Sequence, residues 1–123
     1  MSKVLDKLVG KTIRKIDGLY PGSEEVTIYC MDGDIFRLYH EQDCCENVEL
    51  NDVEVDTDNF YLALVISAEE VCGESPSDFT YGNDSHTWTF YKIETTQGGI
   101  WMRWLGESNG YYSEEVTVDH RQA

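Results

Sequence analysis

Apolar and polar residues alternate along most of this chain, which is the pattern of strands that are buried on one face. Gly, Pro, Asn, Asp or Ser lie near the ends of many of these segments, which predict strands at residues 12–16, 25–30, 34–39, 65–71, 87–95, 100–105 and 111–118. Residues 46–56 fit an edge strand or a short ordered loop.

Turn signals connect several of these strands. Asp32-Gly33 predicts a hairpin between the second and third strands. Residues 97–99 and 108–110 are expected to be the turns that join the last three strands.

Helical spacing is confined to two short segments. Residues 2–9 place four apolar side chains at helical spacing and are closed by Gly10, and a further helical turn is expected at 58–64. A length of 123 residues fits one domain. We therefore expect an α+β fold in which residues 1–123 form a single compact domain, dominated by an antiparallel β-sheet and carrying a short N-terminal helix.

The charge of the chain is strongly negative. Nine Lys and Arg against 24 Asp and Glu give a net charge of −15, a field that repels polyphosphate and argues against a nucleic-acid partner. No apolar run approaches the roughly 20 residues of a membrane span, and residues 1–10 are too short and too charged for a signal peptide. A cytoplasmic location without a membrane partner is expected, and the four cysteines are expected to be reduced thiols.

Residues 39–46 (YHEQDCCE) form a dense cluster of reactive side chains. His40 and Cys44 have a spacing that allows both to bind one metal ion, and a Cys nucleophile with a His base is a second possibility. Neither a Cys-x-x-Cys pair nor a hydrolase signature accompanies them, which favours a loop packed by buried thiols. The acids between residues 41 and 58 lack the calcium-loop pattern and are expected to be solvated. We therefore predict no catalytic residue, no metal and no cofactor.

The last third of the chain concentrates aromatic side chains. Residues 86–91 (HTWTFY) and 101–114 (WMRWLGESNGYYSE) contain all three tryptophans together with one cation, Arg103. Flat rings, an amide and a guanidinium are the groups that bind a nucleotide base and its phosphate. Aromatic strands are also common in cores, and Asn-Gly is also an ordinary hairpin turn, so a purely structural role stays open.

Arg103 is the residue on which these two interpretations differ most. In a strand it shares a face with Trp101 and Leu105. It then either grips a phosphate or forms a pair with Glu107 or Glu114 that shapes an interface.

Residues 73–85 are rich in Pro, Gly, Ser and acids, which predicts a mobile loop. Phe79 in this loop is a candidate lid over a bound base. The alternative is an ordinary loop whose Phe79 packs into the core.

Four segments together indicate a family. Residues 39–46, 68–70 (AEE), 87–91 and 103–114 closely resemble the Thoeris anti-defence sponge proteins of bacteriophages and prophages, and the similarity spans residues 10–118. The resemblance implies a non-enzymatic protein that sequesters a cyclic ADP-ribose isomer made by a bacterial immune receptor. It also implies a homodimer or higher homo-oligomer with pockets at subunit interfaces. Some relatives hold cyclic oligonucleotides in separate sites, so these are a further candidate ligand.

The expected ligand-binding residues follow from the chemistry of such a nucleotide. An aromatic face stacks on adenine, and Trp88 and Phe79 are the candidate rings. Arg103 is expected to grip the pyrophosphate, while Asn109 and Tyr111 hydrogen-bond the ribose hydroxyls. The net charge of −15 supports a different function, in which an acidic protein mimics nucleic acid and blocks a nucleic-acid-binding defence protein.

Overall fold

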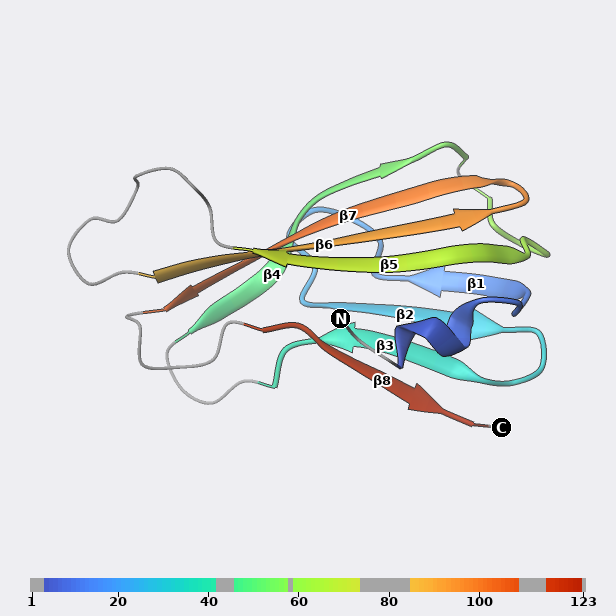
Figure 1. The fold of residues 1–123 in the computed structure, drawn as a ribbon, viewed down its shortest axis with the longest axis horizontal. Helices are drawn as coiled ribbons and strands as arrows, with labels where there is room; N and C mark the ends of the chain where they lie inside the picture. The colour runs from blue at the N-terminus through green and yellow to red at the C-terminus, as the bar shows by residue number, and fades with distance from the viewer. Residues whose placement is uncertain (1–3, 42–45, 58, 74–84, 109–114, 123) are drawn as a thin grey trace.

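Two four-stranded antiparallel sheets make up most of the described part of the chain (Figure 1). The computed structural model describes residues 4–41, 46–57, 59–73, 85–108 and 115–122. In sheet order, sheet 1 consists of β1 (Ile13–Asp17), β2 (Glu25–Cys30), β3 (Ile35–Tyr39) and β8 (Thr117–Arg121). Sheet 2 consists of β4 (Asn47–Val55), β7 (Gly98–Ser108), β6 (Ser85–Thr95) and β5 (Val65–Gly73).

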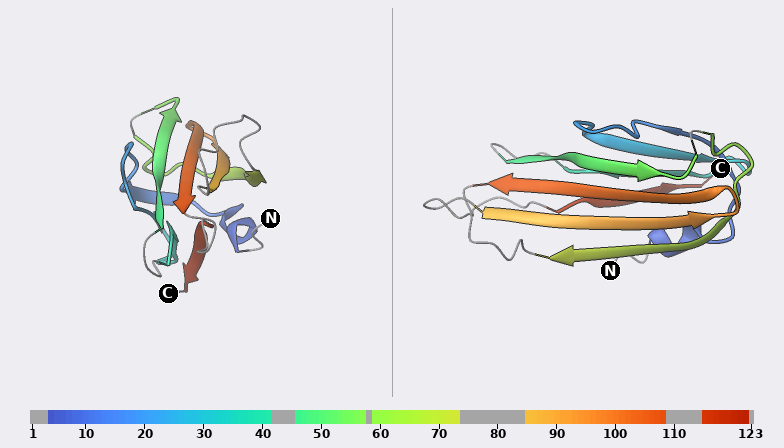
Figure 2. Two further views of the ribbon diagram at one scale, coloured as in Figure 1. Left: turned by 90° about the vertical axis from the view of Figure 1, so that its left-hand side faces the viewer. Right: turned by 90° about the horizontal axis from the view of Figure 1, so that it is seen from above.

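The sheets enclose a common core, and they curve around it when the molecule is seen end-on (Figure 2, left). In strands such as β3, β6 and β7, alternate described residues point inward, as the hydrophobic pattern predicts. The largest fully buried side chains come from both sheets, and among them are Phe36 and Ile28 from sheet 1 and Trp104 and Tyr91 from sheet 2. Burial on one face of each sheet fixes the register, because a slip by one residue would turn every apolar side chain outward.

The N-terminal helix predicted over residues 2–9 is a single 3-10 turn, η1 (Leu5–Leu8), so the fold is mainly β rather than α+β. Leu5 and Leu8 are buried and anchor this turn in the core. Gly10 N donates to the Val65 carbonyl of β5 at 2.9 Å, so the backbone after η1 pairs with a strand and does not continue a helix. Four residues are also too few for a stable α-helix.

The helical turn expected at 58–64 is wrong for its described residues. Leu62 N donates to the carbonyl of Ile13, and Ile13 N donates to the carbonyl of Ala63, so the backbone here pairs with β1. Leu62 has a φ of 67°, which right-handed helix does not allow. The edge strand expected at 46–56 is confirmed as β4, and the Asp32-Gly33 hairpin is confirmed between β2 and β3.

The last three predicted strands do not form one meander. β6 and β7 form the expected hairpin, but β8 lies in sheet 1 and pairs with β3 (Figure 1). β8 also begins at Thr117, whereas the alternating pattern predicted a strand from residue 111. Residues 109–114, which include most of the predicted 108–110 turn and the start of that strand, lie outside the described residues. Strand order across two sheets depends on long-range pairing, which the local pattern does not encode.

Candidate functional site

The outer face of sheet 2 brings Trp88 and Arg103 together. On β6 the residues Thr89, Tyr91 and Ile93 are buried, so their neighbours Trp88, Phe90 and Lys92 face outward. Arg103 on β7 lies opposite Phe90 in the ladder, which makes Trp88 its diagonal neighbour. The predicted shared face of Trp101, Arg103 and Leu105 is confirmed by the same alternation.

The Arg103 guanidinium is held in place by two neighbours. Its Cζ lies 5.1 Å from the ring centroid of Trp88, a cation–π arrangement. Its Nε and Nη2 donate to Asn51 Oδ1 at 3.2 and 2.8 Å. Nη2 also lies 3.9 Å from Asp52 Oδ2. The side chain remains 45% exposed on this face. Glu114, one of the two predicted partners, lies outside the described residues, so an interface role for Arg103 stays a prediction.

Beside this pair lies a shallow groove of about 240 Å³, which we call the sheet-2 groove. Phe90 and Trp101 are 44% and 37% exposed. The lining side chains come from all four strands of the sheet: Asp52, Val53, Glu54, Glu69, Val71, Phe90, Tyr91, Lys92, Trp101, Met102 and Arg103. The groove therefore combines exposed rings with two cations and three acids.

The ladder arranges these charges in rows across the sheet. One row runs from Glu54 through Trp101 and Lys92 to Glu69. The next runs from Asp52 through Arg103 and Phe90 to Val71. Each cation thus lies between an acid and an apolar side chain, so the face offers stacking surfaces and N–H donors at the centre, with carboxylates at the margins.

Three predicted ligand residues, Phe79, Asn109 and Tyr111, lie outside the described residues, as does most of the predicted lid. The strand ends that lead to them are described. Gly73 pairs with Trp88, and Ser85 pairs with Ser108, so these ends of β5, β6 and β7 lie at the Trp88 end of sheet 2.

Asn51 was not predicted from the sequence. Its role depends on the β4–β7 register, which shifts between Leu50 and Asp52. An isolated Asn in a strand of alternating acids carries no local signal for such a contact.

Within the cluster at residues 39–46, His40 near one end contacts Glu46 at the other, and this polar contact is buried. His40 Nδ1 lies 2.8 Å from the Glu115 carbonyl and therefore donates to it, and Nε2 lies 2.8 Å from Glu46 Oε2. Both ring nitrogens are thus occupied, which argues against His40 as a metal ligand or a catalytic base in this conformation. The side chains of His40 and Glu46 are almost fully buried. Cys44 and Cys45 lie outside the described residues.

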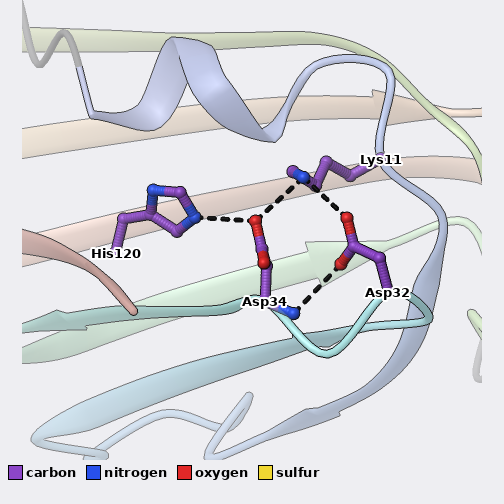
Figure 3. Close-up of polar contacts among 4 residues, drawn as sticks. All are labelled: Lys11, Asp32, Asp34 and His120. Carbon is purple, nitrogen blue, oxygen red and sulfur yellow. Dashed lines mark hydrogen bonds and ion pairs between the residues drawn. The ribbon is translucent and has the colours of Figure 1, made fainter. Parts of the chain in front are cut away.

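A second polar cluster joins Lys11, Asp32, Asp34 and His120 (Figure 3). Lys11 Nζ lies 2.7 Å from Asp32 Oδ2 and 2.9 Å from Asp34 Oδ2. His120 Nε2 lies 2.9 Å from the same Asp34 oxygen, and its ring stacks on Phe36 at 4.3 Å. The cluster ties the β2–β3 hairpin to the chain before β1 and to β8. The cluster therefore has a structural role. From the sequence, only the Asp32-Gly33 turn within it was predicted.

Titration in this region follows from the same contacts. The hydrogen bonds from Lys11 to Asp32 and Asp34 raise the pKa of the lysine, and the Lys11 contact lowers the pKa of Asp32. Burial, reinforced by the Asp32 charge, raises the pKa of the nearby Cys30 thiol to about 11. Cys30 is a buried free thiol, as predicted, and is poorly suited to act as a nucleophile.

Among the described residues, no group of three His, Cys, Asp or Glu side chains is arranged to hold a metal ion. The same part of the chain contains no helix with the length and apolar character needed to span a membrane.

Comparison with known proteins identifies a family without a known activity. No curated protein and no solved structure matches the chain. A family model described as a domain of unknown function, DUF7448, matches residues 6–118, which is nearly the whole chain. The chain therefore belongs to the DUF7448 family.

Proposed function

We propose that this protein binds and sequesters a cyclic ADP-ribose isomer without degrading it, and so blocks a bacterial anti-phage immune signal. The observation that carries the proposal is the Arg103 guanidinium, held by Asn51 and stacked on Trp88 beside the exposed rings of Phe90 and Trp101. The resemblance to the Thoeris sponge proteins supplies the ligand and its place of action, the cytoplasm of an infected or lysogenic bacterium.

The contacts of the site suit a nucleotide that carries a pyrophosphate. Stacking of a base on an aromatic side chain contributes roughly 1–3 kcal/mol. Arg103 uses Nε and Nη2 to hold Asn51, and a guanidinium has five N–H donors, so further donors remain for phosphate oxygens. Because Asn51 fixes the guanidinium before the ligand arrives, less conformational entropy is lost on binding.

The residue types around the groove favour capture over turnover. Its described lining has no serine, cysteine or histidine, and its carboxylates, on β4 and β5, lie at the margins of the face rather than at its centre. Tyr91, which is among the lining residues, is buried. A sponge needs slow release rather than a nucleophile, and differences in affinity between related complexes lie mostly in the dissociation rate.

A second copy of the chain would complete the site. The groove of about 240 Å³ is smaller than the roughly 300–1,000 Å³ of pockets that enclose small organic ligands. Lys92 and Arg103 on the same face as Asp52, Glu54 and Glu69 give a self-complementary pattern, as a twofold interface requires. We propose a homodimer or higher homo-oligomer in which the ligand lies between two chains.

The direct test is calorimetric titration of the cyclic ADP-ribose isomer into the unchanged protein, Arg103→Ala and Trp88→Ala. We expect Arg103→Ala to stay folded and assembled while losing roughly 2 kcal/mol of binding free energy, about 30-fold in affinity. Arg121→Ala is the matched control, because this exposed arginine lies on sheet 1.

Two results would contradict the assignment of Arg103 to the ligand. One is an unchanged affinity in Arg103→Ala. The other is loss of assembly before loss of affinity, measured by light scattering, which would make Arg103 part of the interface. Titration with cyclic oligonucleotides in the same series tests whether they bind, and whether they compete for this groove.

A second candidate function rests on the acids of β4 and of the residue that follows it. Asp52 and Glu54 in β4 and Asp56 directly after it are exposed at alternate positions along this edge of sheet 2, a spaced row of negative charge. Such a row supports mimicry of nucleic acid that inhibits a basic defence protein. Capture of a basic nuclease without small-molecule binding would favour this alternative over the sponge.

A further inference from the structure

A larger cavity lies away from the sheet-2 groove, on the side of the molecule where the edge strands β1 and β4 face each other. Its volume is about 540 Å³, within the range of pockets that take small organic ligands. Two backbone hydrogen bonds hold the chain together in this region. Leu50 N of β4 donates to the carbonyl of Ser23, before β2, at 2.7 Å, and Leu62 N, before β5, donates to the carbonyl of Ile13 in β1 at 2.8 Å. We call this space the edge cavity.

Two half-exposed tyrosines and an apolar surface line the edge cavity. Tyr20 and Tyr61 are 60% and 52% exposed. Ile16, Leu19 and Phe60 supply the apolar contacts. Rings that are exposed beside an apolar hollow offer stacking surface to a planar ligand.

The segment that carries Tyr61 is held rigidly although its ring is exposed. Asn59 Oδ1 accepts a hydrogen bond from Tyr61 N at 3.0 Å, and Gln97 Nε2 donates to the Tyr61 carbonyl at 3.2 Å. Leu62, the next residue, is the one non-glycine with positive φ among the described residues. A strained but well-anchored turn that presents a ring is preorganised for binding.

Two cations meet at the same cavity because of a bulge in β1. The β1–β2 register shifts between Ile13 and Lys15, and consecutive residues Arg14 and Lys15 both lie over the ring of Tyr29. Arg14 Cζ is 5.5 Å and Lys15 Nζ 4.6 Å from its centroid. In a regular strand these side chains would face opposite sides of the sheet. Asp17, 3.6 Å from Lys15 Nζ, offsets only part of this charge.

We propose that the edge cavity is a second binding site, for a small organic anion with a planar ring. The anionic group lies at Arg14 and Lys15, and the ring lies against Tyr20 and Tyr61. This site is separate from the sheet-2 groove, and it does not depend on the sponge function. The net charge of −15 means that most of the surface repels an anion. The two adjacent cations beside the cavity attract an anion at short range, where the distant acids are screened.

The test uses adenosine 5′-monophosphate as the probe and compares it with its two fragments, adenosine and inorganic phosphate. Binding of each is measured from changes in the amide chemical shifts of the protein. We expect shifts at residues 14–20, 57 and 59–61. We also expect an affinity at least about tenfold higher for the probe than for either fragment, because ring and anion are bound together. The double variant Arg14→Ala/Lys15→Ala and the single variant Tyr61→Ala should each weaken binding by about tenfold or more.

The controls separate this site from the sheet-2 groove. Lys7→Ala removes an exposed cation elsewhere and should bind the probe like the unchanged protein. Trp88→Ala should leave the shifts at β1 intact, so a failure of the sponge proposal leaves this one standing. Absence of shifts at millimolar probe, shifts confined to sheet 2, or binding that survives the double variant would overturn the proposal.

Discussion

At the scale of single residues, the contacts that define the candidate site were only half visible in the sequence. Trp88 and Arg103 are recognisable because a cation lies within the densest aromatic stretch. Asn51 is 52 positions away from Arg103, and only the β4–β7 register brings them together. Residue type therefore indicated the chemistry, while the pairing that orients the guanidinium needed the fold.

Leu62 gives a prediction about strain. A left-handed conformation costs a non-glycine residue roughly 1–2 kcal/mol. Leu62→Gly and Leu62→Ala both remove the half-exposed side chain, but only glycine relieves the φ of 67°. We expect the glycine variant to have a free energy of unfolding about 1 kcal/mol higher than that of the alanine variant, measured with urea. Equal stabilities, or a more stable alanine variant, would show that the backbone here is unstrained.

The cluster around Asp32 predicts how stability depends on pH. The pKa of Asp32 is lowered, so its contribution is present above its ordinary pKa and is lost as the solution becomes more acidic. The pKa values of Lys11 and Cys30 are raised, to about 11 for the thiol, so their contributions are complete below the ordinary values and are lost on alkaline titration. The free energy of unfolding should therefore fall on both sides of neutrality.

Cys30→Ala isolates the thiol part of this profile. The unfolded thiol ionises from about pH 9 and the folded one only near 11, so unfolding releases a proton between these values. We expect the alanine variant to lose less stability than the unchanged protein between pH 9 and 11, measured by chemical denaturation. Parallel profiles over that range would contradict the shift.

At the scale of elements, the sequence predicted strands well and helices badly. Alternation locates strands because half-burial of a sheet imposes it directly, as in β2, β3 and β6. The segment at 58–64 has apolar residues that also fit a helix, but its backbone bonds to Ile13. The place of β8 beside β3 could not be predicted from the sequence. Which sheet a strand joins depends on the whole core and on long-range contacts such as that of His120 with Asp34.

The buried His40–Glu46 contact predicts strong coupling between two elements, the chain after β3 and the start of β4. A double-mutant cycle with His40→Ala and Glu46→Ala should give a coupling free energy of about 1.5–3 kcal/mol, because each single change leaves a buried polar partner. The exposed pair Lys15–Asp17 on sheet 1 is the matched control, for which a coupling below about 1 kcal/mol is expected. Additivity for His40 and Glu46 within about 0.5 kcal/mol would mean that they act independently.

At the scale of the whole molecule, a net charge of −15 opposes association, so an interface must supply apolar area and local cations. The outer face of sheet 2 has both, in Phe90, Trp101, Lys92 and Arg103. The resemblance to the sponge proteins implies an interface between chains, and its place on this face stays a prediction.

Phe90→Glu should convert the assembly to a monomer with an unchanged circular dichroism spectrum, because it places a charge in the centre of the proposed interface. Met31→Glu, an exposed change in the β2–β3 turn, should keep the mass of the unchanged protein. Light scattering at micromolar concentration measures both. A monomeric unchanged protein, or a Phe90→Glu variant that stays assembled, would contradict an interface on this face.

The central claim is that the protein captures its ligand without altering it, and one measurement tests this most directly. The protein is incubated with the cyclic ADP-ribose isomer, freed of unbound ligand by gel filtration and denatured by heat, and the released molecule is identified by mass spectrometry. We predict recovery of the intact isomer in a fixed ratio to the protein, and loss of that recovery in Arg103→Ala. Release of a chemically changed product would indicate an enzyme, and absence of any retained nucleotide would contradict sequestration.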